Sequence, residues 1–292
     1  MPIDYDDMMQ SGAKGLEARY DDRDVMLYAL GVGFMRDPLD EKELPFAYEG
    51  QALKVVPTFA SVVNRGEAPP ERQRMPQKSS INFAMVVDGE RRITFHKPLM
   101  PRAEVLADER MLEVLDKGPG RGAVLVQERV VRDKASGEKL FTMVSSIFAR
   151  GDGGFGGPER GGPELHVLPS RAPDLVKECD TRPDQAFLYA LSGDRNPLHR
   201  DPAIAKAVGF PRPILHGLCS YGTACRAILA TVGEYKPERI GQFDVRFSKP
   251  VFPGETLTVE IWADGKVVSF RAGVKERPGT VVLNNGLCLL RD

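Results

Sequence analysis

The stretch HGLCSYGTACRAILATV, residues 216–232, decides how the second half of this chain folds. Its apolar residues recur every three or four positions and so share one helix face: Leu218, Tyr221, Cys225, Ile228, Leu229 and Val232. Small residues such as Gly222 and Ala224 keep the helix slim, so a sheet can pack closely around it. The stretch predicts a helix from about His216 to Val232, cradled by a sheet.

Strands are expected directly after this helix. Apolar and polar residues alternate over 256–261 and again over 268–275, which is typical of strands with one buried face. Asp264-Gly265 and Pro278-Gly279 supply the turns, and a third apolar run covers 281–290. The second half is therefore expected to be helical and irregular first, and then to end in an antiparallel sheet.

The first half repeats this plan. Leu27-Tyr-Ala-Leu-Gly31 matches Leu188-Tyr-Ala-Leu-Ser192, and the FHKPLMP run at 95–101 matches FSKPVFP at 247–253. Strands are predicted over 104–109, 123–132 and 140–149, and a short helix interrupted by Pro57 near 53–63. A glycine-rich segment separates the halves and reads as a flexible or loosely draped linker.

These patterns predict an α+β protein with a tandem, or double, hot-dog fold, in which each antiparallel sheet wraps a central helix. The expected organisation is an N-terminal hot-dog over residues 1–150, a glycine-rich linker over 151–164 and a C-terminal hot-dog over 165–292.

Composition excludes several classes of protein. The net charge is −1, with 40 basic and 41 acidic residues, so there is no basic face for nucleic acid. No apolar run approaches the roughly 20 residues that cross a bilayer, and neither end carries a recognisable targeting signal. The four cysteines form no CxxC pair. We therefore expect a cytoplasmic protein with reduced thiols and no membrane or nucleic-acid partner.

The segment YALSGDRNPLH, residues 189–199, places a carboxylate, an amide and an imidazole within six residues. The first half keeps Leu-Tyr-Ala-Leu but has no counterpart of Asp194, Asn196 or His199, so folding does not need them. His199 is a candidate general base, and Asp194 either orients it or acts as an acid. The alternative for the pair is an Asx-turn with a surface histidine, and Asn196 either holds the turn or binds water.

Gly217 is expected at the start of the helix, where free N–H groups and a partial positive charge favour an anionic oxygen. That is the geometry of an oxyanion hole, and the alternative is a packing glycine. His216 is expected to be structural. Asp194, His199, His216 and Cys219 have the right chemistry for a metal but no compact zinc spacing, so no metal is predicted. No dinucleotide fingerprint is present.

The 189–199 segment resembles the signature of hydratase 2 enzymes, the (R)-specific 2-enoyl-CoA hydratases of the MaoC-like dehydratase group. The resemblance extends to Arg23–Gly31, Tyr48–Gly50, Val114–Gly118 and Arg246–Gly254. It implies that Asp194 and His199 form the catalytic pair and that Gly217 holds the thioester oxygen. It further implies substrate contacts at Lys117 and Phe247, and at Asp88-Gly89, where the family has a His-Gly pair. Asn196, from the turn, is a further candidate for substrate binding. The family has histidine where this chain has Asp88.

The resemblance implies reversible hydration of a trans-2-enoyl-CoA to a (3R)-3-hydroxyacyl-CoA, as in fatty-acid β-oxidation. Coenzyme A is part of that substrate, so no separate cofactor is expected, and the assembly is expected to be a homodimer. Two alternatives stay open, a hot-dog acyl-CoA thioesterase and a non-catalytic acyl-CoA-binding protein. The sequence leaves open the acyl chain and which of Asp194 and His199 takes the proton from water.

Overall fold

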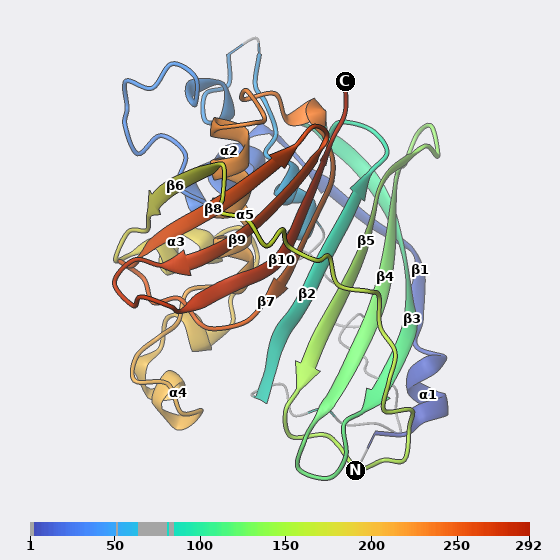
Figure 1. Ribbon diagram of the computed structural model, residues 1–292. Helices are drawn as coiled ribbons and strands as arrows, with labels where there is room; N and C mark the ends of the chain where they lie inside the picture. The colour runs from blue at the N-terminus through green and yellow to red at the C-terminus, as the bar shows by residue number, and fades with distance from the viewer. Residues whose placement is uncertain (1–2, 51, 64–80, 82–84) are drawn as a thin grey trace.

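The computed structural model describes residues 3–50, 52–63, 81 and 85–292, and its main feature is one strongly curved antiparallel sheet (Figure 1). Ten strands follow one another across this sheet in the order β1-β3-β4-β5-β2-β7-β10-β9-β8-β6. Their bounds are β1 Gly12–Tyr20, β2 Val86–Phe95, β3 Ala103–Asp116, β4 Ala123–Asp133, β5 Lys139–Ala149, β6 Leu175–Asp180, β7 Ile240–Phe247, β8 Thr256–Asp264, β9 Val267–Val274 and β10 Val281–Leu290.

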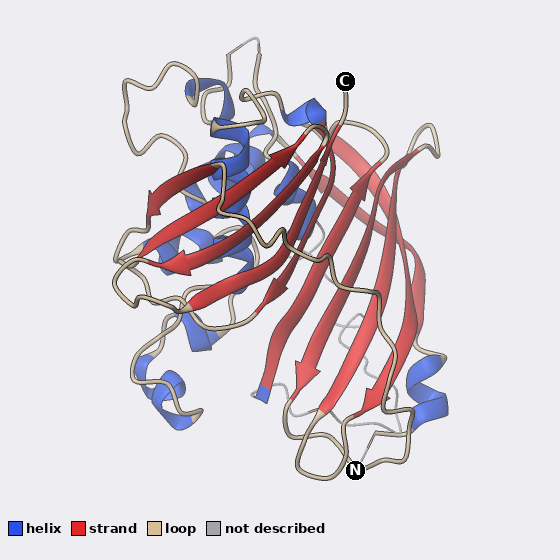
Figure 2. Cartoon of the chain, in the orientation of Figure 1, coloured by secondary structure: helices blue, strands red, loops and turns tan. Residues whose placement is uncertain are grey.

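Most of the helical segments gather behind the strands of the second half, and two short helices lie apart from them, one below these strands and one at the opposite edge of the sheet (Figure 2). The helical elements are α1 Tyr5–Met9, α2 Asp22–Gly31, α3 Gln185–Ala190, α4 Pro202–Ala207 and α5 Gly217–Ala230, with 3₁₀ turns η1 Leu44–Phe46, η2 Pro57–Ser61, η5 Pro197–His199 and η6 Pro237–Arg239. None of the helices in the described ranges is long and apolar enough to cross a membrane.

The predicted central helix is confirmed as α5. It has 14 residues, of which 11 are buried, and it packs against β6, β7 and β8. Three strands predicted in each half are also confirmed, as β8, β9 and β10 and as β3, β4 and β5. The hot-dog arrangement therefore follows from the same buried helix face and alternating strands that the sequence displays.

The two half-sheets join edge to edge. Strand β2 of the first half pairs with β7 of the second, from Glu90 opposite Arg246 to Thr94 opposite Gln242. This seam was not predicted, because pairing between strands about 150 positions apart leaves no local pattern in the sequence. Its effect is to bring the start of β2 close to the helix of the other half.

The expectation that the strands of each half come only after its helical part is wrong. β1 precedes α2 in the first half, and β6 precedes α3 in the second. Both strands lie at the outer edges of the sheet, and most of their residues are exposed or half-buried. Edge strands with little buried surface do not need the strict alternation that reveals a strand in sequence.

The helix expected near 53–63 is shorter than predicted. Within the described residues, only the 3₁₀ turn η2, Pro57–Ser61, forms there, and all five of its residues are buried. Proline at its first position removes a backbone donor and favours the start of a helical turn over its interior. This turn packs against α5 of the second half.

The glycine-rich segment is anchored, contrary to the expectation of a loose linker. The segment connects β5 to β6 in the chain, and Figure 1 shows it running across one face of the sheet. Asp116 at the end of β3 accepts hydrogen bonds from the amides of Gly154 and Gly156, both at 2.7 Å. Just beyond the linker, the carbonyl of His166 accepts one from Asn285 Nδ2 at 2.9 Å. Contacts with both half-sheets thus hold the segment in place.

The repeated Leu-Tyr-Ala-Leu motifs meet in space. They lie on α2 and α3, which pack side by side, and the rings of Tyr28 and Tyr189 are 6.0 Å apart between centroids. Both tyrosines are fully buried. The motif therefore packs the two halves against each other. The two copies differ in the residues that follow, since only the second is followed by Asp194, Asn196 and His199.

Candidate active site

A tight turn after α3 carries the candidate catalytic residues. Gly193 has φ of +109°, a conformation open to glycine and strained for other residues. Asn196 then holds the turn: its amide donates to Asp194 Oδ1 at 3.2 Å, and its own Oδ1 accepts from the amide of Leu198 at 3.0 Å. The sequence left open whether Asn196 holds the turn or binds water, and these contacts are those of a turn-holding residue.

His199 is buried at the end of this turn, with 9% of its surface exposed. Its Nδ1 lies 2.9 Å from the carbonyl of Ile214, which can only accept, so Nδ1 carries the proton and Nε2 has a lone pair. Burial lowers the pKa of His199, while the Ile214 carbonyl and the carboxylates of Asp194 and Asp88 act to raise it. The side chain is thus a neutral imidazole able to accept a proton.

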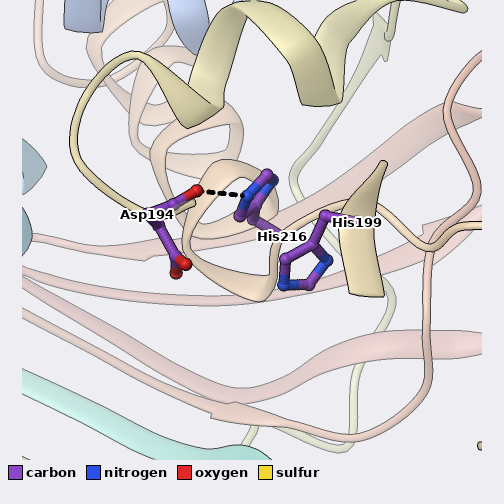
Figure 3. Close-up of side chains that lie close together, drawn as sticks. All are labelled: Asp194, His199 and His216. Carbon is purple, nitrogen blue, oxygen red and sulfur yellow. Dashed lines mark hydrogen bonds between the residues drawn. The ribbon is translucent and has the colours of Figure 1, made fainter. Parts of the chain in front are cut away.

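Asp194, His199 and His216 come together in one small volume (Figure 3). One carboxylate oxygen and one nitrogen of each imidazole all lie within 4.8 Å of one another. The buried His216 Nε2 donates to the backbone carbonyl of Asp194 at 3.1 Å. The His199 and His216 rings lie 3.8 Å apart between centroids, at 31°. A carboxylate and two imidazoles are therefore close together in this volume.

The amide end of α5 borders the same site. Gly217 is the first residue of the helix, and no side chain caps its N-terminus. A Cβ added to Gly217 would lie 3.2 Å from the ring of Phe247 and 3.5 Å from Asp88 Oδ2. Only glycine leaves this approach open, so an oxygen can reach the helix amides, which carry partial positive charge.

Asp88 reaches the site from the other half of the chain. It lies on β2, and Arg91 Nη2 is 3.4 Å from its Oδ1. Only 3% of Arg91 is exposed, so this carboxylate accompanies a buried cation. Gly89 forms an irregularity in the β2–β5 pairing, where a side chain would collide with Ser146.

Lys117 lies apart from this group. It follows the end of β3, three strand spacings or about 14 Å from the start of β2. Its Nζ donates to the carbonyl of Glu159 in the linker at 2.5 Å. Phe247 and Asp88 lie beside Gly217 at the N-terminus of α5. Asp194 and His199 contact the preceding residue, His216.

The three-residue cluster also has ligand types suited to a metal. Each imidazole donates through one nitrogen to a backbone carbonyl, an arrangement that metal-ligating histidines also have. Ligand atoms around a tetrahedral zinc lie about 3.3 Å apart, given Zn–N distances near 2.0 Å. For comparison, the three candidate ligand atoms here lie within 4.8 Å of one another. The absence of a resident metal stays a prediction.

Sequence reasoning underestimated two neighbours of the site. His216 was expected to be structural only, yet it contacts both candidate catalytic residues. Arg91 carried no signal at all, because it sits in the charged run Glu90-Arg91-Arg92 that reads as a solvated strand face. The position of His216 directly before Gly217 could have indicated from the sequence that His216 lies at the site.

Comparison with known proteins matches both halves. Residues 166–285 match the MaoC like domain, and residues 19–151 match the MFE-2 hydratase 2 N-terminal domain. Enoyl-CoA hydratase ChsH3 of Mycobacterium tuberculosis is 38% identical over 97% of this chain and 98% of its own. The peroxisomal enoyl-CoA hydratase 2 of Arabidopsis thaliana is 39% identical over 90% of this chain and 88% of its own.

Solved structures agree. The crystal structure of a MaoC-like dehydratase from Phytophthora capsici covers 99% of this chain and 98% of its own, with a TM-score of 0.87 and 33% identity. A protein of M. tuberculosis described as a double hotdog fold covers 99% of this chain and 98% of its own with a TM-score of 0.55 at 16% identity, which supports the fold alone. Because family models match both halves and relatives of 38–39% identity cover at least 90% of the chain, it belongs to the MaoC-like dehydratase family, in the two-repeat form of the hydratase 2 enzymes.

Proposed function

We propose that this chain is a hydro-lyase that adds water reversibly to a trans-2-enoyl-CoA and forms a (3R)-3-hydroxyacyl-CoA. The observation that carries the proposal is the convergence of Asp194, His199 and the uncapped amide end of α5 at Gly217. Relatives named enoyl-CoA hydratase and 3-hydroxyacyl-thioester dehydratase, alike over most of the chain, support it.

The first step of the proposed mechanism polarises the substrate. The thioester oxygen accepts a hydrogen bond from the Gly217 amide, which draws electrons from the double bond and makes C3 electrophilic. Negative charge then develops on that oxygen, where the helix N-terminus stabilises it. Removing a preorganised donor of this kind costs about 3–4 kcal/mol of barrier.

The second step transfers protons. A water between Asp194 and His199 attacks C3; one member of the pair takes the water proton and the other delivers a proton to C2. The hydroxyl ends on C3 and the hydrogen on C2, and the reverse reaction uses the same groups. The lone pair on His199 Nε2 favours His199 as the base and leaves Asp194 as the acid.

The substrate contacts are proposed in the same frame. Phe247 flanks the thioester beside Gly217, with Asp88 and Gly89 on the opposite strand. Asn196 acts through the turn it holds. Lys117 lies at the same end of the sheet but about 14 Å away, so we assign it to a distant part of the coenzyme A moiety.

One experiment separates hydration from the thioesterase alternative. The purified chain is incubated with trans-2-enoyl-CoA substrates of increasing bulk while loss of the enoyl absorbance and release of free thiol are followed together. We expect loss of absorbance without thiol release, and a (3R) product by chiral analysis. Thiol release at the rate of substrate loss would favour the thioesterase, and binding without either change would favour a non-catalytic acyl-CoA-binding protein.

A cytoplasmic location and a homodimer complete the proposal. Relatives from several eukaryotes are named peroxisomal, so fractionation of the native host is the test of location. Light scattering on the purified chain tests the dimer, and a monomer mass at micromolar concentration would contradict it.

A further inference from the structure

We propose that His216 is a positioning residue that holds both Asp194 and His199 in their working geometry. The inference rests on the proposed function and assigns to His216 a part in the same site. Three separate observations support it: a hydrogen bond, a ring contact and the place of His216 at the end of α5.

The hydrogen bond ties down the Asp194 loop. His216 Nε2 donates to the backbone carbonyl of Asp194 at 3.1 Å, across 22 positions of sequence. The loop on either side is open, since Gly193 is half-buried and Arg195 and Asn196 are exposed. The buried His216 side chain, just before α5, thus fixes the backbone position of Asp194, although the turn that carries Asp194 is at the surface.

The ring contact fixes His199. The centroid of the His216 ring lies 3.8 Å from that of His199 and 4.9 Å from that of the fully buried Tyr189. Packed rings cannot rotate without moving their neighbours. His199, which is held at Nδ1 by the Ile214 carbonyl, is thereby also held in its plane, with Nε2 pointing at a fixed place.

The place of His216 limits its own charge. It is the N-cap residue of α5, where the helix dipole disfavours a cation, and only 1% of it is exposed. A second positive charge 3.8 Å from His199 would oppose protonation of His199 during the reaction. His216 therefore serves best as a neutral donor, with His199 alone taking up a proton.

A merely structural histidine would behave differently. Its replacement would lower stability and leave kcat of the folded fraction unchanged. A positioning residue affects kcat more than KM, because misplacement of catalytic groups by about 1 Å costs on the order of 100-fold in rate. The two roles are therefore separable by kinetics on folded protein.

Two variants divide the contacts of His216 between them. His216→Phe keeps the ring packing and loses the donor to Asp194, whereas His216→Gln keeps a donor at about the same reach and loses the ring. We expect kcat for crotonyl-CoA hydration to fall about 10- to 100-fold in His216→Phe with KM changed less than about threefold. His216→Gln should also lower kcat, because it removes the ring that holds His199 in its plane.

A matched control is His96→Phe, because His96 follows the far end of β2 and contacts Thr142 instead of the site. Circular dichroism and thermal unfolding establish that each variant is folded; if His216→Phe is not, His216→Gln against wild type decides. Wild-type kcat in either folded variant would overturn the inference, because each variant removes one of the two proposed positioning contacts. Absence of hydration by the wild-type chain would instead overturn the proposed function.

Discussion

The charge state of His199 depends on groups from both halves of the chain. Burial lowers its pKa, and the nearby carboxylates of Asp194 and Asp88 partly restore it. Of the groups around this imidazole, Arg200 acts in the same direction as burial, and His216 packs against its ring. Because a base must be unprotonated, activity should fall as pH drops through the pKa of His199.

Asp88→Asn tests this balance. It removes a carboxylate that raises the pKa of His199 and leaves the buried charge of Arg91 less compensated, so both effects lower that pKa. We expect the acid limb of the kcat/KM profile to move to lower pH. The control is Asp292→Asn, an exposed carboxylate near the chain's end. A shift to higher pH would refute this account of the site's electrostatics.

Gly217→Ala tests the approach to the helix amide. The new Cβ would lie 3.2 Å from Phe247 and 3.5 Å from Asp88 Oδ2, which is tight for side chains yet leaves the backbone in place. We expect a folded protein with kcat/KM at least about tenfold lower. Gly273→Ala on β9 is the matched control, since its Cβ would meet one carbonyl at 3.3 Å away from the site. Equal activity in both variants would mean that Gly217 is only a packing glycine.

Among the elements, those with strong periodicity were predictable. The buried face of α5 and the alternating strands β8 and β9 are visible in the sequence because each has many buried side chains. Edge strands β1 and β6, and the anchoring of the linker at Asp116, were not, because they depend on partners far away in the chain. The same reasoning applies to the site. Asp194 and His199 are visible in one short motif, whereas the position of Asp88 beside Gly217 depends on the pairing of β2 with β7.

Strand β7 carries a buried carboxyl with a measurable consequence. Asp244 lines a cavity of about 270 Å³ with residues 164–166, at the junction of the linker and the second half. Burial raises its pKa from 3.8 to about 6, against a hydrogen bond from Gln242 Nε2 at 2.6 Å. A folded-state pKa above the unfolded one contributes stability below pH 3.8, and that contribution is lost as pH rises through 6.

Asp244→Asn should therefore flatten the pH dependence of stability between about pH 4 and 7. The variant avoids a charge that costs the wild type up to about 3 kcal/mol at neutral pH, so it should be relatively more stable at pH 7.5 than at pH 4.5. Urea unfolding at the two pH values measures this. An equal stability difference at both would show that Asp244 ionises as readily in the folded state as in the unfolded state.

For the whole molecule, the seam makes the two halves one unit. β2 pairs with β7, η2 packs on α5, and α2 packs on α3. The proposed catalytic residues come from the second half, and Asp88 comes from the first. The hot-dog repeat was predictable from the sequence, but this dependence of one half on the other was not.

Separate expression of the halves tests that dependence. Residues 165–292 alone would expose the β7 edge and the α5 surface covered by Pro57–Ser61, so we expect an inactive, poorly folded fragment. Co-expression with residues 1–164 should restore hydration. A folded, fully active 165–292 fragment would contradict the proposal that both halves complete the site.

The central claim is that Asp194 and His199 perform the proton transfers of hydration. Its most direct test is the rate of crotonyl-CoA hydration by Asp194→Asn and His199→Gln, each shown by circular dichroism to be folded. Both replacements keep the size of the side chain and remove its acid or base function, so we expect each to lose at least about 100-fold in kcat. Rates equal to the wild type in both folded variants would contradict the account.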